Sequence, residues 1–238
     1  MAASNQSCRV WTRFERKRKD GSLVKLRIQD TPESVVKNVV EFMIKYFPAQ
    51  ETFQKAAGVS TSPEAMTEYR AMLEEFIVPF GLVICCHDDT EEVGEVLGMT
   101  AVDKYQEEPF DLNQVKSEEM RKFFKMTQEC ENLVKPITNE FNNYHAGKGL
   151  LVHPDYRGLG IASELVKIRR LMMIEQNVSL SCTWMSAYGS QKAAEKDNWE
   201  IVYEVNSEEL GKKYDVVFED APPTFKFYVT RNPNYKKE

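Results

Sequence analysis

The chain has 238 residues, of which 42% are hydrophobic and 29% are charged. These proportions are typical of a folded globular protein, so they exclude intrinsically disordered and fibrous classes. The net charge of −6 at pH 7 disfavours a general binder of nucleic acid or of anionic membranes, and it would attract cations such as protonated amines.

The cysteines bear on the compartment. No C-x-x-C pair is present among the five, which are Cys8, Cys85, Cys86, Cys130 and Cys182. Their odd number, and the lack of a secretory leader in the opening residues MAASNQSCRV, predict reduced thiols in a cytoplasmic protein. The longest apolar stretch, around PFGLVICC, is much shorter than a membrane span. We therefore expect no membrane partner and no nucleic-acid partner, whereas the oligomeric state stays open.

The first predicted element is a β-hairpin. The segments VWTRFERK and SLVKLRIQ flank K-D-G, and the D-G pair is a strong hairpin turn signal. Residues 1–20 are therefore expected to contain the first strand of this hairpin, ahead of a single domain over residues 21–238.

Two helices and a pair of strands come next. Thr31 and Pro32 are expected to begin a helix, the segment FPAQETFQKAAG is predicted as a loop, and Ser62-Pro63 mark the start of a second helix. FGLVICC and VLGMTAVD are predicted to pair as antiparallel strands across the polar turn HDDTEEVG.

The second half alternates helices with strands. Its predicted elements are a helix from residue 117 to about 133, the strand GLLVHP, a helix from about 159 to 175, the strand NVSLSCTWM, the short helix QKAAEK, and the strands WEIVYEV and FKFYVTR. The full order ββ-αα-ββ-α-β-α-β-α-ββ predicts an α/β layered domain around one mixed sheet.

Residues 150–162, LLVHPDYRGLGIA, place two glycines just ahead of a predicted helix. A helix N-terminus presents unpaired backbone N–H groups, and residues without a Cβ let a phosphate approach the main chain. A tight strand-to-helix turn without a ligand would look similar. The chain lacks G-x-x-x-x-G-K-[ST], so it is not a P-loop protein, and it lacks the third glycine of a dinucleotide fingerprint.

The fuller motif resembles that of the GCN5-related N-acetyltransferases, whose signature is [QR]-x-x-G-x-[GA]. The residues that fit it are Arg157, Gly158, Leu159, Gly160, Ile161 and Ala162. Two further segments resemble the insect arylalkylamine N-acetyltransferase branch. KYFPAQETF is similar to the F-x-x-D-E-P-L segment, and MSAYGSQKAAEKDNWE to the segment with two serines four residues apart. The resemblance spans most of residues 20–230, so it identifies the 21–238 unit as an N-acetyltransferase domain.

The resemblance implies a mixed sheet of about seven strands flanked by helices, with acetyl-CoA between two parallel strands that splay apart. Leu151 and Val152 would offer backbone groups to the pantetheine arm, and the main chain from Arg157 to Ser163 would wrap the pyrophosphate. Lys192 could reach the CoA end, or it could be an ordinary solvated lysine.

Acetyl transfer requires the amine, with a pKa near about 10.4, to lose a proton. The resemblance implies Glu51 as the general base, acting through water; the alternative is an ordinary loop carboxylate. The backbone N–H of Val152 is the expected oxyanion donor. Ser186 and Ser190 match the paired serines, for which the alternative is helix capping by Ser190. Tyr188 is a candidate proton donor to the thiolate, or a packing residue.

Some residues depart from the family pattern. Gln50 and Thr52 replace residues around the glutamate of the D-E-P-L segment, and Ala194 stands where many members have a tyrosine acid. Other candidates for chemistry are Cys182, expected to be a buried thiol, and the possible bases His145 and His153, of which His153 is expected to orient its loop. No metal-ligand spacing occurs, so no metal is expected.

These patterns predict an acetyl-CoA-dependent N-acetyltransferase for small primary amines. Dopamine, tryptamine or octopamine would suit the aromatic and methionine side chains near the substrate segment, which are also plain core candidates: Tyr46, Phe47, Phe53 and Met185. A polyamine-like or aliphatic amine stays open, as does a CoA-binding module of the same fold that has lost catalysis. A protein N-acetyltransferase is disfavoured because the inserted helices would cover a peptide groove.

Overall fold

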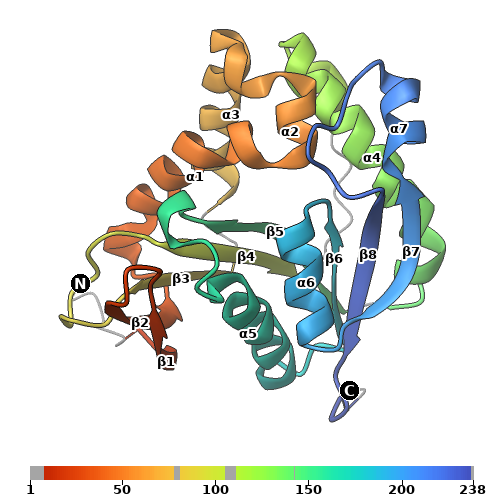
Figure 1. The fold of residues 1–238 in the computed structure, drawn as a ribbon. Coiled ribbons are helices and arrows are strands. Elements are labelled where there is room, and N and C mark those ends of the chain that lie inside the picture. The colour runs from red at the N-terminus through yellow and green to blue at the C-terminus, as the bar shows by residue number, and fades with distance from the viewer. Residues whose placement is uncertain (1–7, 78–80, 105–110, 142, 237–238) are drawn as a thin grey trace, which may run out of the picture.

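The computed structural model describes residues 8–77, 81–104, 111–141 and 143–236. Within them, one sheet of eight strands runs through the molecule in the order β1-β2-β3-β4-β5-β6-β8-β7 (Figure 1). The strands are β1 (Val10–Lys17), β2 (Leu23–Asp30), β3 (Gly81–His87), β4 (Gly98–Lys104), β5 (Tyr144–Val152), β6 (Leu180–Met185), β7 (Glu200–Asn206) and β8 (Thr224–Arg231). Neighbouring strands are antiparallel except for β5 and β6, which are parallel.

The α/β layered fold is confirmed, with a small correction to the number of strands. The expectation was about seven, whereas the sheet has eight, because the N-terminal hairpin is part of the sheet and β1 forms its outer edge. The first seven residues of the predicted 1–20 segment, and Phe80 of the predicted strand FGLVICC, lie outside the described residues.

Helices cover both faces of the sheet. One face packs against the first four helices, and the other packs against α5, with α6 beside it (Figure 1). Their bounds are α1 (Val36–Gln50), α2 (Thr52–Ala57), α3 (Pro63–Phe76), α4 (Glu118–Thr138), α5 (Ile161–Glu175), α6 (Tyr188–Lys196) and α7 (Ser207–Tyr214). None of the described helices is long and apolar enough to cross a membrane.

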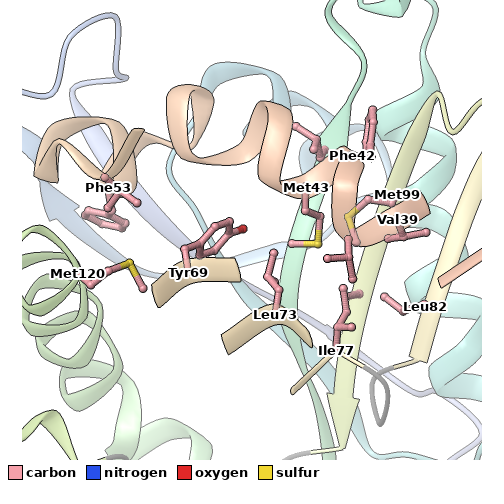
Figure 2. Packing of buried hydrophobic residues seen from close by; sticks show 14 of the residues in the cluster. Val39, Phe42, Met43, Phe53, Tyr69, Leu73, Ile77, Leu82, Met99 and Met120 are labelled. Atoms are coloured by element: carbon pink, nitrogen blue, oxygen red, sulfur yellow. The ribbon is translucent and has the colours of Figure 1, made fainter. Parts of the chain in front are cut away.

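The larger core lies between α1, α2, α3, α4 and the sheet. Figure 2 shows Tyr69 and Leu73 of α3 between Phe53 of α2 and Met43 of α1. Alternate residues of β3 separate the two cores, since Leu82 and Ile84 face this cluster while Val83 and Cys85 face α5. The sheet is therefore buried on both sides, as the layered prediction requires.

The start of α3 follows the predicted capping chemistry. Ser62 is the N-cap, its Oγ accepts a hydrogen bond from the backbone N–H of Ala65 at 3.3 Å, and Pro63 occupies the first helical turn. This prediction is confirmed.

The prediction that FPAQETFQKAAG forms a loop is wrong, because most of this segment is helical and only Glu51 separates its two helices. Helix α1 continues through Pro48 to Gln50, and α2 begins at Thr52. The residue between them, Glu51, is extended and caps α2 with its carboxylate, and Gly58 ends α2 with a φ of 82°. A carboxylate cap supplies the acceptors that the first N–H groups of α2 need, so no loop is required.

Helix α7 was missed, because the predicted order runs from WEIVYEV directly to FKFYVTR. Asn206 caps this helix, accepting from the N–H of Glu209 at 3.0 Å, and Asp215 ends it in the left-handed region.

Strands β5 and β6 pair over a short distance and then part. The ladder contains Tyr144↔Leu180, His145↔Ser181 and Ala146↔Cys182, and it records no pair beyond them. Beside this point, β5 carries a bulge, since Ala101 lies opposite Gly149 and Val102 lies opposite Gly147. The predicted splayed parallel strands are therefore confirmed, since β5 from Gly147 and β6 from Thr183 run on without pairing to each other. We refer to the region between these unpaired ends as the opening.

Candidate active site

The main chain of β5 lines one side of the opening. The His153 N–H donates to the carbonyl of Leu97 at 2.9 Å, and the Leu151 carbonyl lies 3.2 Å from the position that a Cβ on Gly98 would take. Leu151 and His153 thus direct their backbone groups toward β4. Because these directions alternate along a strand, Leu150 and Val152 direct theirs into the opening.

By this geometry Val152 and Leu150 direct their backbone groups into the opening, whereas Leu151 directs its groups toward β4; the contact of Leu151 and Val152 with the pantetheine arm stays a prediction. Sequence patterns did not single out Leu150 for binding. The choice between neighbouring residues depends on the register of β5 against β4, which no local motif encodes.

The glycine loop lies between β5 and α5. Gly158 and Gly160 have φ values of 81° and 78°, a region that disfavours residues with a Cβ. Gly160 is the N-cap of α5 and makes no side-chain cap, and nothing lies within 4 Å of a Cβ placed on Gly158. The first backbone N–H groups of α5 therefore have no side chain capping them, which suits an anion.

The other residues predicted to bind the cofactor differ in their burial and in their hydrogen bonds. Ile161 is buried beneath the loop, with Leu159 packed against the same cluster, so these two anchor the turn. The guanidinium of Arg157 donates to the Gln50 side chain. Ala162 and Ser163 are partly buried in the first turn of α5, and Lys192 is exposed on α6.

Glu51 and Ser186 lie in direct contact although they are far apart in the sequence. The hydroxyl of Ser186, just after β6, donates to Oε1 of Glu51 at 3.1 Å, and the Thr52 hydroxyl donates to the Ser186 carbonyl at 2.9 Å. The carboxylate also accepts from the N–H groups of Phe53 and Gln54, at 3.1 and 2.8 Å. The end of β6 is thus joined to the start of α2.

Burial raises the pKa of Glu51 above its ordinary value, and the hydrogen bonds from Gln54, Phe53 and Ser186 oppose this rise. A carboxylate whose pKa is raised is, in its ionised form, a stronger proton acceptor than an ordinary one. The same hydrogen bonds give Glu51 a structural role as a helix cap, so its two roles must be separated by experiment.

Ser186→Ala should raise the pKa of Glu51 further, because the variant loses a donor that favours the ionised carboxylate. The rising limb of kcat/KM against pH should therefore move to higher pH. Steady-state kinetics across pH check this, beside thermal unfolding. A large loss of stability with an unmoved limb would make Ser186 purely structural.

Ser190→Ala is the matched comparison, because the Ser190 hydroxyl donates to the carbonyl of Ala187 at 2.9 Å and makes no contact with Glu51 in the described structure. The rising limb of its kcat/KM against pH should stay where it is in the parent protein. Tyr188, at the start of α6, is 52% exposed. Among the described residues, no hydrogen bond joins it to Glu51 or Ser186.

The remaining candidates for chemistry are engaged elsewhere. His153 bonds through Nε2 to the Tyr46 hydroxyl at 2.8 Å and accepts from the Asp155 N–H at 3.2 Å, so it orients the loop after β5. His145 bonds to Gln176 at 3.0 Å, at the paired end of β5 and β6. Burial raises the pKa of the Cys182 thiol, which disfavours a nucleophilic thiolate.

The aromatic residues near α2 form a packed cluster, of which the sequence patterns singled out only Phe53. Phe53 packs edge-on against Phe225 and Phe218, with ring centroids 4.9 and 5.4 Å apart. Phe218 follows the unpredicted helix α7, and Lys55 pairs with Glu219 of the same segment at 3.1 Å. These contacts fix α2, and with it Glu51, against the end of the sheet.

Trp184 is a further candidate that sequence patterns missed, while Met185 lies elsewhere. Trp184 packs toward Phe227 on the α4 side, and its indole Nε1 has no hydrogen-bond partner among the described residues. Met185 packs with α5 and α6 on the opposite face. No group of three or more His, Cys, Asp or Glu that could hold a metal occurs in the described part of the chain.

Comparisons with known proteins agree with this architecture at the level of the fold. No protein-family model and no curated protein matches the chain. Among solved structures, a protein described as an insect putative arylalkylamine N-acetyltransferase 7, from the yellow fever mosquito Aedes aegypti, is similar, with a TM-score of 0.81, 22% identity, and coverage of 97% of this chain and 98% of that one.

Two others are similar at a TM-score of 0.66. Arylalkylamine N-acetyltransferase 2 of Aedes aegypti is 17% identical, covering 87% of this chain and 98% of its own. A Drosophila melanogaster polyamine N-acetyltransferase that forms N-acetylagmatine is 11% identical, covering 87% and 99%. The splayed strands, the glycine loop and these likenesses together show that the chain has the fold of the GCN5-related N-acetyltransferases.

Proposed function

We propose that the protein transfers an acetyl group from acetyl-CoA to a small primary amine. The observation that carries this proposal is the contact between Glu51 and Ser186, which joins a carboxylate of raised pKa to the residue that directly follows β6. A fold used only to hold CoA would need the glycine loop, whereas its cap for α2 would need neither a raised pKa nor the hydroxyl of Ser186.

In this proposal the opening holds the pantetheine arm along Leu150 and Val152, and the main chain from Arg157 to Ser163 surrounds the pyrophosphate. The hydrogen-bond donors to acetyl-CoA are backbone N–H groups of the opening and the glycine loop. The identity of the side chains therefore matters little there. Lys192 on α6 contributes charge near the CoA end.

The chemistry then follows from the groups around Glu51. Glu51 takes a proton from the ammonium through water, and the free amine attacks the thioester carbon. A backbone N–H of β5 stabilises the oxyanion, the carbon–sulfur bond breaks, and the proton that the attacking nitrogen must lose to become an amide passes to the departing thiolate to give CoA. Ser186 holds the carboxylate, while Tyr188 and Ser190 stay candidates for proton transfer and substrate positioning from the start of α6.

For the acceptor we favour an arylalkylamine of the dopamine, tryptamine or octopamine type. Its support is the cluster of Phe53, Phe218 and Phe225, which packs at the start of α2 directly after Glu51, together with the unpaired indole N–H of Trp184. Aromatic faces suit a ring that carries a cationic side arm.

The five cysteines are all free in the structure, which agrees with action in the cytosol.

A polyamine or agmatine is the second candidate, favoured by the net charge of −6. Measuring kcat/KM with tryptamine, octopamine, spermidine and agmatine at a fixed acetyl-CoA concentration separates the two. The aromatic amines should lead. A ranking headed by agmatine or spermidine would replace the arylalkylamine assignment with the polyamine one.

A further inference from the structure

Arg169 is a buried cation that the proposed chemistry has not yet used. It lies in α5, only 1% of its surface is exposed, and it forms no ion pair within the described residues. Its neighbours in the helix face, Leu165, Ile168 and Met172, are apolar core residues. A charge buried among such residues is costly unless another group compensates it.

The guanidinium reaches the point where β5 and β6 part. Its Nε donates to the Thr100 hydroxyl at 2.6 Å, and a second nitrogen donates to the carbonyl of Gly149. A third, Nη1, lies 2.4 Å from the position of a Cβ on Gly147, so only glycine fits there while Arg169 is in place. Thr100 itself donates to the Gly149 carbonyl at 3.1 Å, which gives that oxygen two donors from neighbouring side chains.

Arg169 keeps its charge at neutral pH. Burial lowers its pKa to about 10, so the guanidinium is protonated in the cytosolic range although its surroundings disfavour the charge. Burying a charge without an ion partner costs free energy, which the hydrogen bonds of Arg169 to Thr100 and Gly149 must offset. An arginine at this position is therefore not explained by stability alone.

The carbonyl that Arg169 holds belongs to the peptide between Gly149 and Leu150, and the N–H of this peptide points into the opening. The Gly149 carbonyl and the Leu150 N–H belong to one planar trans peptide, in which C=O and N–H point in opposite directions. Arg169 and Thr100 hold the carbonyl, so the Leu150 N–H faces the opening, in agreement with the alternation along β5. Donation to a carbonyl polarises its peptide and strengthens the N–H as a donor.

We propose that Arg169, together with Thr100, is a positioning residue that fixes the bulge in β5 and strengthens the Leu150 N–H as the donor to the thioester oxygen. This inference rests on the proposed acetyl transfer and makes Leu150, rather than Val152, the principal oxyanion donor. The carbonyl paired with the Val152 N–H is that of Leu151, which faces the neutral backbone of β4, whereas the Leu150 peptide is held by a cation.

The test uses Arg169→Met, Thr100→Val and, as a matched control, Arg170→Met in the same helix. Arg170 pairs with Asp197 at 2.8 Å, away from Gly149. Calorimetry measures acetyl-CoA affinity, and infrared spectroscopy measures the stretching frequency of the ¹³C-labelled thioester carbonyl in bound acetyl-CoA without amine. Thermal unfolding reports the fold of each variant.

In the parent, binding should lower the carbonyl frequency, because a strong donor polarises the bond. Arg169→Met should return the frequency toward that of free acetyl-CoA and lower kcat/KM roughly tenfold, less than the ~10²–10³-fold loss of a whole oxyanion donor. Thr100→Val should shift the frequency in the same direction, so the test stands even if Arg169→Met does not fold. Arg170→Met should leave the frequency where it is.

The outcomes separate this inference from the function on which it rests. A parent protein that binds no acetyl-CoA would overturn both. A parent that binds it, with the same carbonyl frequency in Arg169→Met and Thr100→Val, would overturn the role of Arg169 and leave the proposed function standing. A frequency shift in Arg170→Met as large as in Arg169→Met would also refute the specific role.

Discussion

Glu51→Gln should lower kcat/KM by about 10²–10⁴-fold near neutral pH, because a general base contributes an effect of this size. The loss should shrink as the pH rises toward the pKa of the amine, since free amine then arrives already deprotonated. The rate of the variant should therefore keep climbing where the rate of the parent levels off. Acetyl-CoA affinity, measured by calorimetry, should barely change.

The pH profile is decisive because Glu51 also caps α2. Losing a cap costs about 1 kcal/mol of stability, and glutamine would place an amide against the N–H donors of Phe53 and Gln54. Ser62→Ala is the matched control, because it removes the cap of α3 at a site without proposed chemistry. It should lower stability by a similar amount and leave the shape of the pH–rate profile alone. A flat, fully active Glu51→Gln profile would show that Glu51 is only a cap.

The raised pKa of Glu51 also has a consequence for stability. The protonated carboxyl is favoured in the folded state, so the stability linked to this shift is present below the carboxyl's ordinary pKa and is lost as the pH rises through the folded pKa. Glu51→Gln, which cannot titrate, should remove that part of the pH dependence of the unfolding free energy.

Gly160→Glu should weaken CoA binding by about 10²–10³-fold, since like charges about 4 Å apart near a surface repel by about 4 kcal/mol. The new carboxylate would stand at the N-cap of α5, where the pyrophosphate is proposed to lie. Its Cβ would lie 3.4 Å from Nε of Arg16, which is close to an ordinary van der Waals contact. Calorimetry with CoA measures the loss.

Backbone strain at residue 160 needs its own control, because φ is 78° there. Gly160→Gln serves, since glutamine has almost the shape of glutamate and carries no charge. It should retain most of the CoA affinity while showing similar strain. Equal losses in the two variants would attribute the effect to strain and remove the evidence for phosphate at the loop, and full affinity in Gly160→Glu would contradict the loop assignment outright.

Local sequence chemistry predicted the elements whose ends carry their own signals. The D-G turn of the first hairpin and the Ser62-Pro63 cap appear in the structure as expected. Helices α2 and α7 were missed because their caps, Glu51 and Asn206, are residues that are equally common in loops. Only their hydrogen bonds to the next turn distinguish a cap from a loop residue.

The candidate site depends on contacts that no local pattern encodes. Glu51 and Ser186 are 135 residues apart, so only the family resemblance suggested that they act together. The choice of Leu150 over Leu151 follows from strand register. Arg169 did leave a signal, because it follows Leu165 by four residues and precedes Met172 by three, which places it on the apolar face of α5.

The central claim is acetyl transfer to an amine, and one incubation tests it most directly. The purified chain is mixed with acetyl-CoA and tryptamine, and CoA thiol release and acetylated amine are followed together, the latter by mass spectrometry. We predict one acetylated amine for each CoA released, at a rate that depends on tryptamine and falls sharply in Glu51→Gln. Acetyl-CoA binding without any acetylated product, from tryptamine or from octopamine, spermidine and agmatine in its place, would contradict the claim and leave a CoA-binding module of this fold.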